Sequence, residues 1–431
     1  MKYYSTRKKS EEVSFKDAVI RGLAPDGGLY FPERIDKLPE GLIGSGASIE
    51  ELGYEVAKRF VDGEIPDSDL QRIVSETVNF PLPIVEVEQD VYSLELWHGP
   101  TCAFKDVGGR FLGRCLSHFV QQSGDKVTIL VATSGDTGSA VASGFLGVEG
   151  IDVVILYPKG LVSKIQEQQL TTMGQNISTL EVEGSFDDCQ AMVKQAFNDP
   201  ELRAAMKLSS ANSINVARFL PQSFYYFGSY EQLEDKTKPV VYSCPSGNFG
   251  NLTAGMFAKE MGLPIARFIG ATNANDVVPE YLKTGIYKAR PSIPTISNAM
   301  DIGDPSNFVR ILELHGGDWE KVKTSMVGYA FSDEETKEGM RDVISRTGYL
   351  MEPHGVIGYM AVKEYQKHHD VQGVVLETAH PAKFGDVVEP VIGQKVEVPE
   401  RLQEYMKREK VATLIQPDFN QLKQYLLARA K

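Results

Sequence analysis

The 431-residue chain has few cysteines and no long apolar segment. Its four cysteines (Cys102, Cys115, Cys189 and Cys244) are far apart and form none of the close pairs typical of zinc or redox sites. We therefore expect reduced, structural thiols and no metal site. No run approaches the roughly 18 apolar residues that cross a bilayer, and MKYYSTRKKSEE at the amino end is followed by no apolar signal core. These features predict a cytoplasmic protein.

Positive charge is also scarce, since the formal net charge is −13. Nucleic acids and anionic membranes are bound largely through surplus Lys and Arg, so neither is expected as a partner. An anionic ligand would instead need backbone N–H groups at helix starts and a few well-placed cations. The composition, 42% hydrophobic and 24% charged, is that of a globular protein long enough for two or three domains.

Short β-branched apolar runs alternate with segments at helical spacing from about residue 126 onward. The pattern predicts an α/β fold of mostly parallel sheets covered by helices. The predicted strands are 126–133, 152–158, 177–184, 239–245, 266–272 and 373–379, and the predicted helices include 164–173, 186–197, 251–261 and 356–368. Residues 1–84, with turn-rich LAPDGGLYFPE and two helical patterns, are predicted to form an amino-terminal subdomain. The charged tail from about 398 is predicted to be helical and to dock on the body.

The first candidate segment is WHGPTCAFKDVGGRF (97–111), in which Lys105 opens a helical pattern over 106–122. A lysine at a helix start that is partly removed from water loses proton affinity, and its neutral amine can attack an aldehyde. Taken alone, Lys105 is better explained as an ordinary surface lysine.

The second segment, TSGDTGSAVA (133–142), directly follows a predicted strand. Its glycines permit close backbone approach, and its hydroxyl and N–H groups can hold a carboxylate beside the favourable dipole of the next helix. The simpler interpretation is a strand-to-helix turn capped by Ser134 or Asp136.

The third segment, CPSGNFGNL (244–252), again leads from a strand through glycines to a helix. Successive N–H groups from Gly247 to Asn251 can cradle a phosphate without a lysine. The segment lacks the GK[ST] ending of a Walker loop and the G-x-G-x-x-G pattern of dinucleotide sites, so nucleotide binding is poorly supported.

The fourth segment, LETAHPAKFGD (376–386), ends an apolar run with the hydroxyl of Thr378. A neutral hydroxyl can hydrogen-bond a pyridine nitrogen without fully protonating it. The alternative for Thr378 is a strand-end residue that caps the next turn. We interpret His380 as a packed histidine and Lys383 as a solvated lysine.

Together these segments resemble the pyridoxal-phosphate enzymes of the tryptophan-synthase-like fold (fold type II), and most closely the threonine synthase family. The resemblance covers nearly the whole chain, through GLAPDGGLYFPE, HGPTCAFKD, ATSGDTG, PSGNFGN and ETAHPAKF in the family's order. It implies an α/β fold of the tryptophan synthase β type with an amino-terminal extension. The cofactor implied is pyridoxal 5'-phosphate.

The resemblance also assigns roles to individual residues. Lys105 becomes the Schiff-base lysine, Thr378 the partner of the pyridine nitrogen, and the loop with Ser134, Gly135 and Thr137 the site of the amino-acid carboxylate. The cofactor-phosphate cradle is Gly247, Asn248, Phe249, Gly250 and Asn251.

A second phosphate site, for the substrate, is implied by the segment NSINVAR. It supplies Asn212, Ser213 and Arg218, and the planar fork of an arginine matches phosphate oxygens. Without the resemblance, Arg218 would be taken for a solvated helix residue.

Asp136 departs from the pattern of many relatives, which carry Asn there, and resembles the longer, amino-terminally extended branch of the family. The resemblance places Asp136 near the ring oxygen of the cofactor, where an ionised carboxylate would be repelled by a phenolate-like oxygen. We assign Asp136 to the cofactor's surroundings and leave its role open.

The implied reaction converts O-phospho-L-homoserine and water to L-threonine and phosphate, by γ-elimination and β-addition of water, as the final step of threonine biosynthesis. The implied domains are 1–84, a small and mobile 85–160 with Lys105 and the SGDTG loop, and a large cofactor-binding 161–431. A serine or threonine dehydratase is one alternative, although it needs no second anion site. A non-catalytic ligand-binding protein is another. The oligomeric state is left open.

Overall fold

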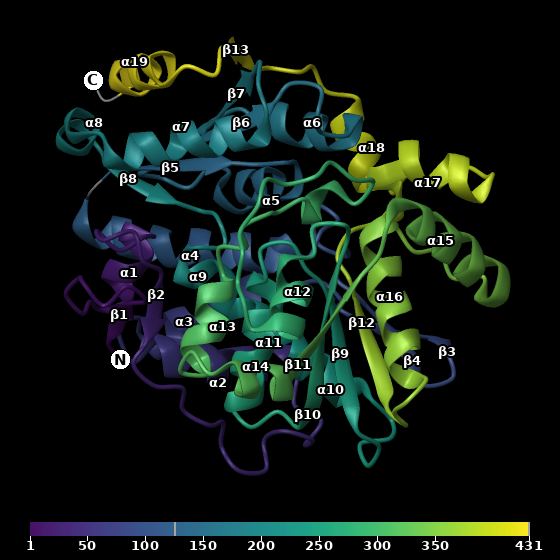
Figure 1. Cartoon of the computed structure of the whole chain (residues 1–431). Coiled ribbons are helices and arrows are strands. Elements are labelled where there is room, and N and C mark those ends of the chain that lie inside the picture. Colours follow the sequence, from purple (N-terminus) through teal and green to yellow (C-terminus); the bar gives the residue numbers. More distant parts are fainter. Residues whose placement is uncertain (125, 430–431) are drawn as a thin grey trace.

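The computed structural model describes residues 1–124 and 126–429, which form two mostly parallel sheets covered by helices (Figure 1). The larger sheet has six strands, and within it only β3 and β4 are antiparallel. In spatial order it consists of β11 (Met326–Ala330), β10 (Ile265–Thr272), β9 (Val240–Pro245), β12 (Gln372–Glu377), β4 (Val91–Glu95) and β3 (Ile84–Glu88). Helix α16 (Pro353–Gln366) packs on β9, β10 and β12.

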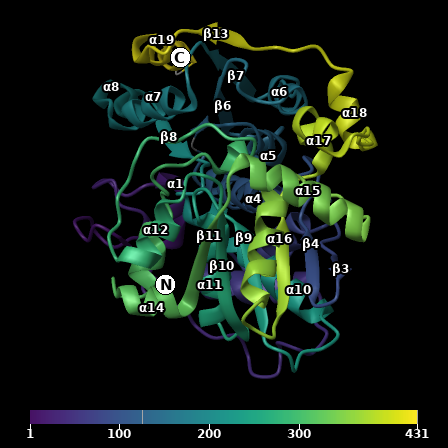
Figure 2. The same ribbon diagram turned by 45° about the vertical axis from the view of Figure 1, so that its right-hand side comes forward.

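The smaller sheet is parallel throughout and lies above the larger one in both views (Figure 1, Figure 2). Its order is β13 (Thr413–Ile415), β7 (Ile177–Val182), β6 (Ile151–Pro158), β5 (Val127–Ala132) and β8 (Lys207–Ser210). Buried apolar residues of α7 (Phe186–Asn198) and α19 (Phe419–Arg429) share a core with these strands.

The amino-terminal residues add a two-stranded antiparallel sheet, β1 (Tyr3–Ser5) with β2 (Tyr30–Pro32), and three helices. The helices are α1 (Phe15–Arg21), α2 (Ile49–Val61) and α3 (Asp67–Thr77). Both α1 and α3 pack against α4 (Lys105–Ser123). The extension therefore supports the helix that begins with Lys105.

The remaining helices connect the strands or cover the sheets. They are α5 (Asp136–Phe145), α6 (Lys164–Thr171), α8 (Pro200–Ala205), α9 (Val216–Phe219), α10 (Ser223–Gln232), α11 (Gly250–Glu260), α12 (Val277–Thr284), α13 (Phe308–Leu314), α14 (Trp319–Ser325), α15 (Asp333–Thr347), α17 (Gly385–Ile392) and α18 (Glu400–Met406). Within the described chain, no helix combines the length and apolar character needed to cross a membrane.

The predicted elements form close to their predicted positions. All six predicted strands are present with ends within two residues of the prediction, and the four predicted helices with ends within three. The prediction of a helical tail was wrong in one respect, because β13 interrupts it and pairs with β7. Three residues are too few to show a periodic hydrophobic pattern in the sequence. The strand forms where this segment pairs with the edge of β7.

The strands are not distributed between the two sheets according to the predicted domain boundaries at residues 84 and 160. Strand β4 belongs to the larger sheet, whereas β7, β8 and β13 belong to the smaller one. A small mobile domain over 85–160 stays a prediction.

Candidate active site

Lys105 is the first residue of α4 and is partly exposed. Its Nζ lies 5.4 Å from the centroid of the Phe104 ring and makes no hydrogen bond or ion pair within the described part of the chain. Burial by the surrounding protein, helped by the cations Arg218 and Lys383, lowers the pKa of Lys105 to about 8. An amine with this pKa is partly neutral at pH 7 to 8 and can serve as a nucleophile or a base.

Three of the predicted segments leave the carboxyl ends of neighbouring parallel strands. The phosphate cradle follows β9, Thr378 follows β12, and the lysine segment follows β4. Strand β12 is paired with both of the others. Because adjacent strands lie about 4.8 Å apart, the two outer segments are separated by about two strand spacings. Open α/β sheets bind ligands at this edge.

Backbone hydrogen bonds fix the lysine segment against the end of β12. The N–H of Phe104 donates to the carbonyl of Thr378 at 2.8 Å, and the N–H of His380 donates to Cys102 O at 3.1 Å. Lys105 is thereby held beside Thr378, as the predicted cofactor site requires.

The cradle has the close backbone approach expected of an anion site. Phe249, a non-glycine residue, adopts φ 60° at the amino-terminal end of α11. A Cβ at Gly247 would lie only 2.9 Å from Met300 Cα, so no side chain fits there. The buried Nδ2 of Asn251 has no hydrogen-bond partner among the described residues. Strained backbone and an unpaired buried donor are both typical of a ligand site.

The SGDTG loop follows β5 in the smaller sheet and opens α5. Thr133 Oγ1 accepts hydrogen bonds from Gly135 N (2.9 Å) and Gly138 N (2.8 Å). Neither Ser134 nor Asp136 caps the helix through its side chain, contrary to the simpler interpretation of this turn. Ser134 and Thr137 are partly exposed, so their side chains are accessible to a ligand.

The predicted substrate-phosphate residues follow β8, next to β5, and contact the end of β5 and the segments that start α11 and α13. Asn212 Nδ2 donates to Ala132 O at 3.0 Å, directly before the SGDTG loop. Ser213 Oγ accepts from Asn307 Nδ2 at 2.9 Å, and Ser213 Cβ would be 3.3 Å from a Cβ placed on Gly250 of the cradle. The two predicted anion sites therefore adjoin each other.

Arg218 is 2% exposed, so the interpretation as a solvated residue was wrong. Its Nη1 donates to the carbonyl of Lys105 at 2.9 Å, whereas its buried Nε has no partner among the described residues. Burial lowers the pKa of Arg218 to about 10. A buried guanidinium with an unused donor beside Lys105 suits an anionic substrate group.

Lys383 is buried as well, which corrects its interpretation as a solvated lysine. Its Nζ lies 2.6 Å from Asp136 Oδ1 and donates to Thr101 O at 2.9 Å. Burial raises the pKa of Asp136, but Lys383 and Lys105 outweigh burial and lower it to about 2. Asp136 is thus an ionised group with its own counter-ion. The 3-10 turn Pro381–Phe384 brings the two side chains together, and spacing in the sequence did not show it.

His380 is a packed histidine, as interpreted. Its Nδ1 accepts from Ala382 N at 3.1 Å, and its ring lies edge-on to Trp97 with centroids 6.0 Å apart. Burial lowers the pKa of His380 to about 4.

Two supporting residues were not predicted. Gln166 belongs to the capping box of α6 with Ser163, but its Nε2 also donates to Asp136 Oδ1 at 2.9 Å. Arg310 of α13 is fully buried and donates to Ser213 O (3.1 Å) and to Tyr30 O of the amino-terminal extension. The capping pattern shows the local role of Gln166 only, and the sequence around Arg310 gives no signal.

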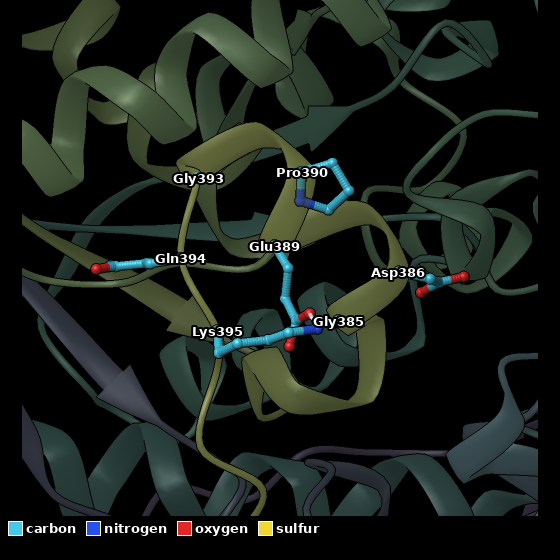
Figure 3. A pocket seen from close by; sticks show the side chains of 7 residues that line it. All are labelled: Gly385, Asp386, Glu389, Pro390, Gly393, Gln394 and Lys395. Atoms are coloured by element: carbon cyan, nitrogen blue, oxygen red, sulfur yellow. Dashed lines mark hydrogen bonds and ion pairs between the residues drawn. The ribbon is translucent and has the colours of Figure 1, made fainter.

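A separate surface hollow is formed at α17 by Gly385, Asp386, Glu389, Pro390, Gly393, Gln394 and Lys395 (Figure 3). Its cation is already neutralised, since Lys395 Nζ lies 2.6 Å from Glu389 Oε2. It contains none of the predicted site residues, so the cluster around Lys105 is the better candidate.

Comparison with known proteins decides the family. A model described as "Pyridoxal-phosphate dependent enzyme" matches residues 76–377, and models of the amino and carboxyl ends of threonine synthase match 2–78 and 356–426. A threonine synthase of Haemophilus influenzae is 46% identical over 99% of this chain and 100% of its own. The chain belongs to the threonine synthase family.

Solved structures of the family superpose closely. Threonine synthase from Escherichia coli matches with a TM-score of 0.93 and 42% identity over 100% of both chains. PLP-bound threonine synthase from Brucella melitensis matches with a TM-score of 0.93 and 38% identity over 100% of both chains. The predicted family, fold, enzyme class and pyridoxal phosphate cofactor are confirmed.

The site fits this cofactor on chemical grounds. The cradle offers backbone N–H groups and the unpaired Asn251 donor for a phosphate, Thr378 a neutral hydroxyl for a pyridine, and Lys105 an amine of lowered pKa for an aldehyde. The roles of the individual residues remain predictions.

Proposed function

We propose that the chain converts O-phospho-L-homoserine and water to L-threonine and inorganic phosphate, as a carbon–oxygen lyase. The observation that carries this proposal is the 2.9 Å hydrogen bond from Arg218 to the carbonyl of Lys105. This bond places the buried guanidinium of Arg218 next to Lys105, where it can bind a substrate phosphate. A dehydratase acting on serine or threonine has no substrate phosphate and needs no such cation. The product makes this the final step of threonine biosynthesis.

Substrate binding is assigned to two anchors. The loop with Ser134, Gly135 and Thr137 binds the amino-acid carboxylate through N–H and hydroxyl groups at the start of α5. Asn212, Ser213 and Arg218 bind the phosphate. Two anchors at opposite ends fix the orientation of the carbons between them, which converts a random encounter into a positioned reaction.

Proton transfer is assigned to Lys105. Pyridoxal phosphate, when bound, would supply an acceptor for the electrons released at the substrate α-carbon. The Lys105 Nζ takes the α and β protons and returns protons later, a task that suits a pKa of about 8. Arg218 holds the phosphate while its bond to the γ-carbon breaks, and water adds at the β-carbon.

The cytoplasmic location predicted above is part of this proposal. The four cysteines are all free and buried, which is typical of proteins from a reducing compartment.

The test is product analysis with O-phospho-L-homoserine and added pyridoxal phosphate. We expect phosphate and L-threonine in equal amounts. Lys105→Ala should lose the violet absorbance that borohydride abolishes in the parent and should lower kcat by about 10²–10⁴-fold. Lys288→Ala, at an exposed lysine, is the matched control and should behave like the parent.

Other results would contradict the proposal. Oxo-acid formation from serine or threonine without use of phosphohomoserine would favour a dehydratase. Substrate binding without turnover would favour a non-catalytic binding protein. A Lys105→Ala protein with an unchanged spectrum would remove the central assignment.

A further inference from the structure

A buried polar network surrounds the carboxylate of Asp136. Its Oδ1 is 2.6 Å from Lys383 Nζ and accepts from Gln166 Nε2 at 2.9 Å. Lys383 also donates to Thr101 O at 2.9 Å, the carbonyl to which Gln169 Nε2 donates at 3.0 Å. Lys383 is therefore the one residue of this network that contacts both Asp136 and Thr101.

The network continues to the catalytic lysine segment. Thr101 donates through its N–H (2.9 Å) and its hydroxyl (2.7 Å) to the two carboxylate oxygens of the buried Asp106, the neighbour of Lys105. Through Lys383, the segment after β12 is thus tied to the SGDTG loop of the smaller sheet and to the Lys105 segment of the larger one.

The charge of Asp136 poses a problem for the proposed function. Asp136 is 4% exposed and lies in the loop assigned to an anionic carboxylate. A buried negative charge there would repel the substrate and would favour the protonated form of the nearby Lys105 amine. A buried counter-ion at 2.6 Å opposes both effects.

We propose that Lys383 is a positioning residue of the active site, whose ammonium group neutralises Asp136 and so sets the charge that Lys105 and an anionic substrate encounter. The proposal rests on the proposed role of Lys105 and goes beyond it. Lys383 touches neither substrate nor cofactor in this assignment and acts through Asp136.

Four charged groups act on Lys105 from the elements packed around it. Asp136 at the start of α5 and Glu352 at the start of α16 raise its pKa, whereas Arg218 of α9 and Lys383 lower it. Removing Lys383 or Asp136 should therefore move the pKa of Lys105 in opposite directions. If the Lys383–Asp136 pair had only a structural role, loss of either partner would loosen the same loop. The two variants would then not shift the pKa of Lys105 in opposite directions.

The experiment compares the parent with Lys383→Met, Asp136→Asn and the double variant. Each is stripped of cofactor, mixed with pyridoxal phosphate between pH 6 and 10, and followed by the rate at which violet absorbance appears. The rate reports the neutral fraction of Lys105, and titration of the cofactor itself is common to all four proteins. We expect a midpoint near pH 8 for the parent.

Lys383→Met should raise the midpoint by about one pH unit and Asp136→Asn should lower it by a similar amount. The double variant, which buries neither charge, should lie between them. Should Lys383→Met fail to fold, the lower midpoint of Asp136→Asn and its partial return in the double variant still test the proposal.

Shifts in the same direction, or no shift in either single variant, would overturn the role of Lys383. A parent protein that never develops violet absorbance would instead overturn the proposed function, so the two failures are distinguishable.

Discussion

Arg218 is only 2% exposed, although it is the residue to which we assign the substrate phosphate. Its guanidinium lies under the start of α4, where Gly108 and Gly109 leave room for it: a Cβ on either would come within 3.2 Å of Arg218 Nη1. One nitrogen is used to hold Lys105 O, and the unpaired Nε keeps a donor for a ligand. Burial strengthens such a contact because water competes less for it.

Arg218→Ala should lower kcat/KM for phosphohomoserine by about 100-fold, since hydrogen bonds to charged groups contribute about 1.5–3 kcal/mol. Arg218→Lys keeps the charge but loses the planar guanidinium group. Its kcat/KM should therefore lie between that of Arg218→Ala and that of the parent. Steady-state kinetics measure both, with the violet absorbance as a check that cofactor is still bound. An unchanged kcat/KM would contradict the phosphate role, and loss of the absorbance would show that Arg218 chiefly supports Lys105.

At the scale of elements, the start of α5 depends on one backbone conformation. Gly135 has φ 133°, a region that residues with a side chain rarely adopt, and a Cβ there would lie 2.5 Å from the side chain of Gln166. Gln166 in turn holds Asp136. The turn, the α6 capping residue and the buried ion pair are therefore coupled.

Gly135→Ala should destabilise the protein by about 1–3 kcal/mol through backbone strain and should lower kcat/KM at least tenfold by displacing Gln166. Gly160→Ala is the matched control, because Gly160 has φ 72° with open space around its Cα. It should cost about 1 kcal/mol and leave kcat/KM unchanged. Thermal unfolding and kinetics measure the two effects. Equal losses of activity in both variants would contradict the coupling.

At the scale of the whole molecule, the candidate site is built from segments that follow strands of both sheets. The cradle and Thr378 come from the larger sheet, and the SGDTG loop and Arg218 follow strands of the smaller one. Lys105 is placed between them and has no ion pair of its own within the described residues. An amine that is desolvated in this way and has no ion pair lowers the stability of the folded protein.

Without cofactor, Lys105→Met should unfold at a higher temperature than the parent at pH 7. The folded pKa of Lys105 is about 8, below its ordinary value of 10.5, so folding opposes the protonated form. This penalty is full below pH 8 and fades as pH rises toward 10.5, because the folded protein then no longer holds the proton. The difference in unfolding temperature between Lys105→Met and the parent should therefore disappear over that pH range. Lys288→Met should unfold at the same temperature as the parent. A difference between Lys105→Met and the parent that grows with pH would refute the lowered pKa of Lys105.

The sequence by itself determined the elements and their class. The apolar runs that became β5, β6 and β9 are long enough to show their period, and helix starts such as Ser163 with Gln166 carry their own caps. The ordered motifs also sufficed for the family and its cofactor. The strands, helix starts and motifs can be read from the sequence because each depends on residues that are close together in the chain.

Tertiary structure alone decided which charges meet. The pairing of Lys383 with Asp136, the burial of Arg218 and the contact of Arg310 with Tyr30 join residues far apart in the sequence. The same holds for β13, which pairs with β7, a strand more than 200 residues earlier in the chain. A single sequence gives no distances between such residues. Only the tertiary packing, in which α4 lies against α5 and α9, gives Lys105 its surroundings and its lowered pKa.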